Sequence, residues 1–210
     1  MVDYVEAIKR PFTDIGKLVL GIILSIIPVV NFIFSGYILN VAKSAMNRDM
    51  KLPEFKDFGK LFIDGVLAGV IGLVYMLPVL ILFGIFMVIG AFSFESLLTG
   101  GTFGMLGALA GMGIYIVILA IVGIIFMLLA SSAVLKYADT REFGSAFEFG
   151  AVSKKAFTGS FLLNWVLTMV IGGVIGFLIG LIPFVGSFLS IYIIGVFSYT
   201  ALAQAYTEAR

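Results

Sequence analysis

The residues that could support chemistry in this chain are a few polar side chains beside or inside long apolar runs. Asp64 precedes one such run, Asn31 follows a proline, and Asn164 stands within another run. In lipid such groups commonly hold an ion or substrate or line a polar cavity. The structural alternatives are a hydrated acid at a helix N-terminus and amides that hydrogen-bond between helices. We favour the structural alternatives.

The chain contains no cysteine and no histidine. This composition excludes disulfides, thiol nucleophiles, imidazole acid–base catalysis and Cys/His metal sites. The sequence also contains no glycine-rich phosphate loop and no nucleophile paired with a base. We therefore expect no enzymatic activity, no catalytic residue, no metal and no cofactor. The net charge of +1 gives no attraction for nucleic acid.

The composition indicates a membrane protein. Of the 210 residues, 61% are hydrophobic and 12% are charged, whereas a soluble domain has about 25% charged residues. A soluble fold could not hide so much apolar surface, so its natural solvent is lipid. We expect an all-α, polytopic protein whose residues 1–210 form a single helical transmembrane domain.

The expected spans follow from uncharged runs and the breaks within them. A membrane-crossing helix needs about 20 apolar residues. Pro28 interrupts the first run and Pro183 the last, and we expect a hairpin turn at each because proline cannot donate to the helix ladder. A loop is expected over residues 96–104. The six expected spans, in three hairpins with short amphipathic cytoplasmic segments, are residues 13–27, 31–46, 61–92, 104–135, 159–182 and 187–206.

The distribution of basic residues orients these spans. The thirteen Lys and Arg fall before the first run, between the first and second, between the third and fourth, and at the C-terminus. All of them lie on one face if the first run crosses twice, and the positive-inside rule makes that face cytoplasmic. We expect a multi-pass protein of the cell membrane with both termini cytoplasmic. The first two spans are short, so their hairpin either crosses fully or is re-entrant.

Two sequence echoes suggest internal repeats. The two proline breaks are followed by Ser, Tyr and Ile at the same offsets, and basic, aromatic segments precede each hairpin. One interpretation is three repeated units, and the other is that such segments simply belong at the membrane interface. The echoing residues are Ile27-Pro28-x-Val30 with Ser35, Tyr37 and Ile38, and Ile182-Pro183-x-Val185 with Ser190, Tyr192 and Ile193.

Three glycines of the fifth span are spaced for close helix packing. Gly172, Gly176 and Gly180 lie four residues apart and share one helix face. Small residues at this spacing let two membrane helices approach closely. We expect packing within the chain rather than dimerisation, although a homo-oligomer stays an alternative.

The stretch from Pro28 to Gly65 resembles a known family. It runs Pro-Val-Val-Asn, then Gly-Tyr-Ile-Leu, then a basic patch, and ends in Leu-Pro-Glu-Phe-Lys-Asp-Phe-Gly-Lys-Leu-Phe-Ile-Asp-Gly. This pattern is similar to a largely archaeal family of membrane proteins catalogued as domain of unknown function 4013. The resemblance implies a multi-pass prokaryotic membrane protein, and it implies no activity.

Two functional hypotheses fit these features. The favoured one is a non-enzymatic membrane scaffold, or a module that organises lipid or a partner. The alternative is a transporter or channel-like protein for a small or apolar solute. The expected partner is membrane lipid, and the sequence does not identify a small-molecule ligand. The absence of charge in the middle of the spans speaks against ion coupling.

Overall fold

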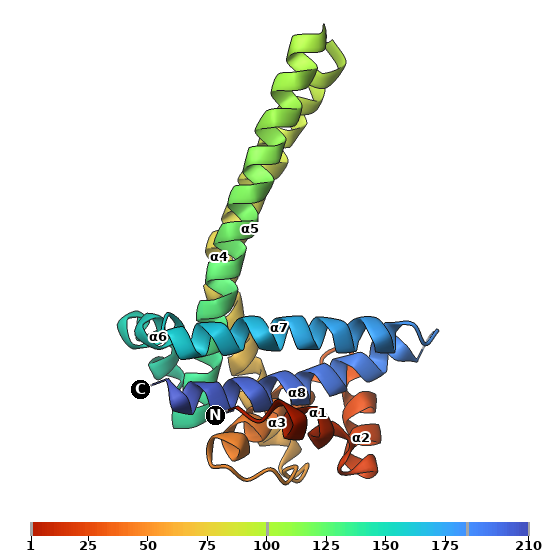
Figure 1. Ribbon diagram of the computed structural model, residues 1–210, viewed down its shortest axis with the longest axis vertical. Coiled ribbons are helices and arrows are strands. Elements are labelled where there is room, and N and C mark those ends of the chain that lie inside the picture. Colours follow the sequence, from red (N-terminus) through yellow and green to blue (C-terminus); the bar gives the residue numbers. More distant parts are fainter. Residues whose placement is uncertain (1, 100, 184, 210) are drawn as a thin grey trace. The chain divides into compact units, whose positions relative to one another are not determined.

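The computed structural model describes residues 2–99, 101–183 and 185–209, except for the side chains of residues 91–99. These residues form α-helices and two short 3-10 helices, and no strand occurs among them, which confirms the expected all-α class (Figure 1). The eight α-helices are α1 (Tyr4–Lys9), α2 (Ile15–Ile26), α3 (Asn31–Met46), α4 (Phe58–Thr99), α5 (Gly101–Thr140), α6 (Phe149–Ala156), α7 (Gly159–Gly180) and α8 (Gly186–Glu208), and the 3-10 helices are η1 (Arg10–Phe12) and η2 (Phe143–Phe147).

The N-terminal helices begin at acidic caps. The Asp3 carboxylate accepts a hydrogen bond from the Glu6 backbone N–H at 2.9 Å, and Asp14 accepts one from the Lys17 N–H at 3.0 Å. Each carboxylate satisfies a donor that the first turn of a helix leaves unpaired. The sequence therefore starts α1 and α2 at defined residues.

The two expected proline breaks both fall between helices. Pro28 lies in the turn that joins α2 to α3, beside Val29, which has a positive φ of 70°. Pro183 lies in the turn between α7 and α8, next to Phe184, which is outside the described residues. By contrast, Pro78 lies inside α4, which continues through it.

The expected loop over residues 96–104 is wrong. Helix α4 continues to Thr99 and α5 begins at Gly101, leaving only Gly100, which is outside the described residues. The stretch keeps the helix-forming Leu97 and Leu98 among its glycines and threonines, and a helix satisfies every backbone group where no water is available. The glycine and threonine content therefore predicted a longer connection between the two helices than the structure has.

The chain divides into two compact units. The first comprises Met1–Gly72 and Ser131–Arg210, and the second comprises Leu73–Ala130. In the first unit, α7 and α8 pack as an antiparallel pair (Figure 1), because Gly172 lies opposite Phe197 and Gly176 lies opposite Ile194. Helices α2 and α3 pack against α8, and α1 contacts its C-terminal half.

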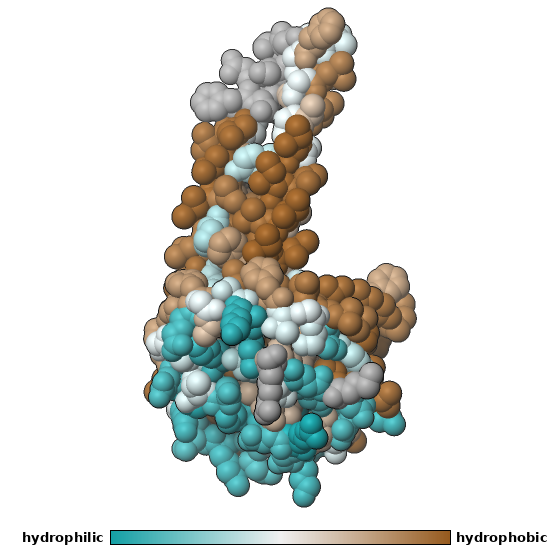
Figure 2. All heavy atoms as spheres, turned by 60° about the vertical axis from the view of Figure 1, so that its left-hand side comes forward, coloured by the Kyte–Doolittle hydropathy of each residue, from teal (hydrophilic) through white to brown (hydrophobic). Residues whose placement is uncertain are grey.

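The second unit is a hairpin formed by residues 73–130, which belong to α4 and α5. The Tyr115 hydroxyl donates to the Leu82 carbonyl at 2.6 Å, and the Tyr115 ring stacks on Phe86 with ring centroids 5.1 Å apart. Most large apolar side chains of the hairpin are exposed, and its surface is predominantly hydrophobic (Figure 2). Exposed apolar surface of this extent is typical of contact with lipid.

Four helices are long and apolar enough to cross a membrane. They are α4 over Phe58–Gly90, α5, α7 and α8, of 33, 40, 22 and 23 residues. Helix α2 has 12 residues and α3 has 16, so at a rise of about 1.5 Å per residue both are shorter than a bilayer core of roughly 30 Å. The described part of the chain thus holds four candidate spans and one short pair of helices.

Candidate functional site

The charged side chains gather in the first unit. All thirteen Lys and Arg lie within residues 1–72 and 131–210, and the second unit holds one charged residue, Glu95, whose side chain is not described. Hydrophilic side chains cover one face of the first unit (Figure 2). We call the groups joined by the ion pairs described there the polar layer: Asp14, Lys17, Glu54, Lys43, Asp139, Asp64, Arg141, Lys136 and Glu148.

The polar layer connects segments that are far apart in the sequence. Lys43, at the end of α3, donates to Asp139 near the end of α5 at 2.5 Å. Lys17, in the first turn of α2, lies 3.3 Å from Glu54 in the connection before α4. The layer therefore brings the beginning of α2 close to the α3–α4 connection, and the end of α3 close to the end of α5.

Asp64 has no free carboxylate oxygen. Its Oδ1 accepts the Tyr137 hydroxyl at 3.0 Å, and its Oδ2 accepts Nη1 of Arg141 at 2.7 Å. Arg141 also donates to Oδ1 of Asn40. The residue is 9% exposed. Asp64 of α4 therefore contacts α5 directly and α3 through Arg141. The sequence pattern had suggested either a solute-binding carboxylate or a hydrated one.

Arg10 is the most deeply buried charged residue that the structure describes in the first unit, with 1% of its surface exposed. Its guanidinium donates to the hydroxyls of Ser44 and Thr200 at 2.6 and 2.9 Å. It also donates to four backbone carbonyls at 3.0–3.2 Å, those of Val41, Asp49, Met50 and Lys51. Burial lowers the pKa of this guanidinium from its ordinary value. One side chain thus ties α3, α8 and the α3–α4 connection to η1.

The two asparagines lie in different surroundings. Asn31 is exposed at the start of α3, where its carbonyl accepts the Ser35 hydroxyl. In α7, Asn164 accepts the Tyr4 hydroxyl at 2.8 Å and donates to the Ser160 carbonyl. Described hydrogen bonds do not connect Asn31, Asp64 and Asn164 with one another. Asn164 instead attaches α1 to α7.

The glycines of α7 differ in their surroundings. A methyl group at Gly172 would make ordinary contacts with α8, one at Gly176 would lie 2.9 Å from Cδ1 of Ile194, and one at Gly180 would meet open space. Closer approach occurs between α3 and α4, where a methyl group at Gly36 would lie 1.9 Å from the Leu61 carbonyl oxygen. No glycine lies four residues from Gly36, so the repeat pattern in the sequence does not single this residue out.

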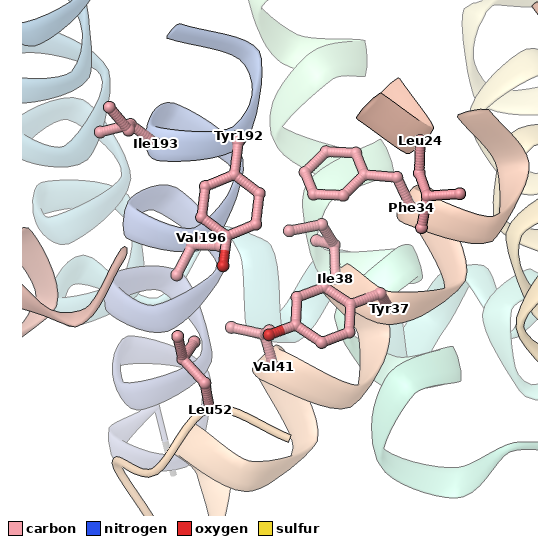
Figure 3. Close-up of a cluster of buried hydrophobic side chains, with 9 residues drawn as sticks. All are labelled: Leu24, Phe34, Tyr37, Ile38, Val41, Leu52, Tyr192, Ile193 and Val196. Carbon is pink, nitrogen blue, oxygen red and sulfur yellow. The ribbon is translucent and has the colours of Figure 1, made fainter. Parts of the chain in front are cut away.

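Equivalent residues of the two sequence echoes meet in one apolar cluster. Tyr37 and Ile38 of α3 pack in the same cluster as Tyr192 and Ile193 of α8 (Figure 3). Tyr37 and Tyr192 are fully buried, and their hydroxyls interact with each other without reaching good hydrogen-bond geometry. The cluster joins the first proline-broken helix pair to the last.

An apolar cavity of about 260 Å³ also lies in the first unit. Four helices line it, and the lining contains no charged residue. Several of the residues that line the cavity are small. The lining residues are Phe34, Ser35, Ile38 and Leu39 of α3, Ala68 and Gly69 of α4, Val134 of α5, and Gly195 and Tyr199 of α8.

These arrangements hold helices together through polar contacts and lie in the same unit as the apolar hollow. The acids of the polar layer are engaged with cations, and among the described residues no group of three or more acids is placed to hold a metal ion. The polar contacts described above connect helices to one another, and the hollow offers apolar contacts.

Comparison with known proteins identifies a family and nothing narrower. The family model described as "Protein of unknown function (DUF4013)" matches residues 19–184, which confirms the resemblance seen in the sequence. No curated protein and no solved structure matches the chain.

Proposed function

The chain belongs to the DUF4013 family of proteins of unknown function, and we propose that it is a non-enzymatic membrane module that organises lipid or a partner protein. It crosses the cell membrane six times, with both termini in the cytoplasm. The proposal has two parts, the role of the polar residues and the arrangement of the spans, and different observations support them.

The observation that carries the functional part is the engagement of Asp64. A carboxylate that binds a transported ion must be able to exchange partners, but both oxygens of Asp64 are held within the protein. Replacing these partners by an ion would leave the Arg141 guanidinium without its carboxylate, which is costly in a partly buried site. The geometry therefore favours a structural role for this residue.

The polar layer supports the proposed orientation. The ion pairs of Lys17 with Glu54 and of Lys43 with Asp139 join helix ends that six crossings would place on one side. The backbone N–H of Asp3 donates to Gln204 of α8 at 2.8 Å, which brings both chain ends together. The short helices α2 and α3 complete their two crossings where the bilayer is locally thinned.

Purified protein in liposomes tests the functional part. We expect that wild-type protein dissipates neither a proton gradient nor a sodium gradient, and that Asp64→Asn behaves identically. Glu142→Gln, at an exposed acid outside the described ion pairs, is the matched control. A protein-dependent flux that Asp64→Asn abolishes and Glu142→Gln preserves would overturn the proposal.

A second candidate is a transporter for a small apolar solute, which the 260 Å³ apolar cavity favours. Single cysteines at Asn31, Asp64 and Asn164 separate the two candidates. A water-filled path across the protein predicts that a polar thiol reagent labels all three positions. The scaffold predicts labelling of the exposed position 31 and protection of position 64, because Asp64 lies among Tyr137 and Arg141.

A further inference from the structure

We propose that the cavity between α3, α4, α5 and α8 binds an acyl chain of a bilayer lipid. This inference rests on the proposed membrane function and makes it specific, because it names the site and the class of ligand. The occupant is part of a lipid molecule rather than a free solute.

Small residues on three helices create the space. Ser35 of α3, Ala68 and Gly69 of α4, and Gly195 of α8 all line it. A methyl group at Gly195 would lie 3.3 Å from the side chains of Phe34 and Ile38, so a larger residue there would crowd α3 and reduce the hollow. No large side chain fills the hollow from these positions.

The crossing of α3 and α4 prevents the walls from closing. Gly36 and Gly65 bring the two backbones together, and a methyl group at Gly65 would lie 1.8 Å from the Phe32 carbonyl oxygen. Backbones already in contact cannot move closer to remove the adjacent gap. An apolar hollow that is held open in this way favours an apolar occupant over water.

The lining and the volume fit a hydrocarbon chain. No charged side chain lines the cavity, and the Ser35 hydroxyl is bonded to the Asn31 carbonyl. The volume of about 260 Å³ exceeds the roughly 150 Å³ that holds benzene in an engineered cavity and is below the range of about 300–1,000 Å³ of drug-sized ligands. A flexible segment of hydrocarbon suits this space.

The cavity is continuous with the apolar surface of α4. Gly69 lines it and is itself exposed, and the neighbouring Val70 is also exposed. Helix α4 is one of the four candidate spans, so its exposed apolar surface faces lipid tails. Acyl chains are therefore the most abundant molecules at the opening.

Photo-crosslinking tests the proposal. The full-length protein is reconstituted in phosphatidylcholine vesicles that contain a phosphatidylcholine with a diazirine in the middle of one acyl chain, and labelled residues are mapped by mass spectrometry. We expect labelling of Ile38 and Tyr199 in the cavity. Ala68→Leu, which fills the cavity, should reduce that labelling several-fold, whereas Ile81→Phe, which adds bulk on the exposed surface of α4 away from the opening, should not. Ser35→Leu fills the cavity from α3 and repeats the test if Ala68→Leu does not fold.

Labelling of the exposed Leu77 and Leu80 on α4 separates failure of this inference from failure of the membrane proposal. Labelling there, with none at Ile38 or Tyr199, would overturn the cavity site and leave the membrane proposal standing. Absence of labelling at all four would overturn both. Cavity labelling by a free diazirine-bearing alkane, but not by the lipid, would also overturn the inference and would favour the transporter.

Discussion

Asp64 and Arg141 form an ion pair of 2.7 Å across 77 residues of sequence, and it links the start of α4 to the residue that follows α5. Asp64→Asn would leave the guanidinium without its charged partner. Because 29% of the Arg141 side chain is exposed, solvent offsets part of the loss, and we expect the free energy of unfolding to fall by about 1–3 kcal/mol. Thermal unfolding in detergent measures this change.

A double variant provides the control for the ion pair. Arg141→Gln removes the cation that Asp64→Asn leaves unpaired, so the double variant should be more stable than the sum of the two single changes predicts. Additive losses would contradict a direct interaction between these side chains.

Replacing the buried Arg10 by lysine should destabilise the folded protein. Arg10→Lys keeps the charge, but an ammonium group has three donors and cannot reach the six oxygens that the guanidinium contacts. We expect a loss of about 3 kcal/mol or more, because carbonyls and hydroxyls are left unpaired in a buried site. Lys9→Arg at the exposed neighbouring position should stay within about 0.5 kcal/mol. Equal thermal stabilities of the two variants would refute this role.

Sequence patterns predicted the helices better than they predicted the contacts. The boundaries of α3 and α7 follow from apolar runs bounded by proline, asparagine or charge, because those signals are local. The role of Arg10 was missed because its partners lie 31–41 and 190 residues away. A basic residue before an apolar run has the same local pattern whether it is exposed or buried.

The surroundings of Asp64 were also only partly predictable, because the sequence shows local signals but not distant partners. The position of Asp64 at the edge of an apolar run indicated an acid near a helix start, but nothing local indicated that Arg141 would return to it. The glycine pattern drew attention to α7, where only Gly176 would crowd α8 if it carried a methyl group, yet the tightest backbone contact involves Gly36 and Gly65. Close approach requires space on the facing helix, which a single-sequence repeat does not reveal.

Glycine substitutions should rank by the contacts of the added methyl group. Gly36→Ala places a methyl group 1.9 Å from a backbone oxygen that cannot move without shifting α4, so we expect a loss above about 3 kcal/mol or failure to fold. Gly176→Ala meets only the flexible end of Ile194 and should cost about 1 kcal/mol or less. Gly180→Ala, with open space around it, should be neutral or stabilising. Thermal unfolding that does not follow this order would contradict the helix contacts.

Removing the hydroxyl of Tyr37 or Tyr192 should not weaken the apolar cluster. Both rings are fully buried, and the two hydroxyls contact only weakly, without good hydrogen-bond geometry. Tyr37→Phe and Tyr192→Phe should therefore leave the free energy of unfolding unchanged or raise it by up to about 1 kcal/mol. A marked loss in either variant would show that the hydroxyl is paired in the membrane.

The orientation of the chain can be measured with single cysteines, since the protein has none of its own. Six crossings place the α2–α3 turn and the α4–α5 turn outside the cell, and the α3–α4 and α5–α6 connections inside. Suitable outer positions are Val29, which is 63% exposed, and Phe103, which is 90% exposed. Asn47 and Gly144 are exposed in the inner connections, whereas the nearby Ser145 is buried and would resist labelling on either side.

An impermeant thiol reagent applied to intact cells should label Val29→Cys and Phe103→Cys but not Asn47→Cys or Gly144→Cys. Permeabilised cells should label all four, which controls for access. If Val29→Cys is protected while Phe103→Cys reacts, the α2–α3 pair is re-entrant from the cytoplasm and the number of full crossings is four, since α2 has only 12 residues to span the bilayer. Labelling of Asn47→Cys in intact cells would overturn the orientation itself, because the ion pair between Lys43 and Asp139 holds the ends of α3 and α5 on the same side.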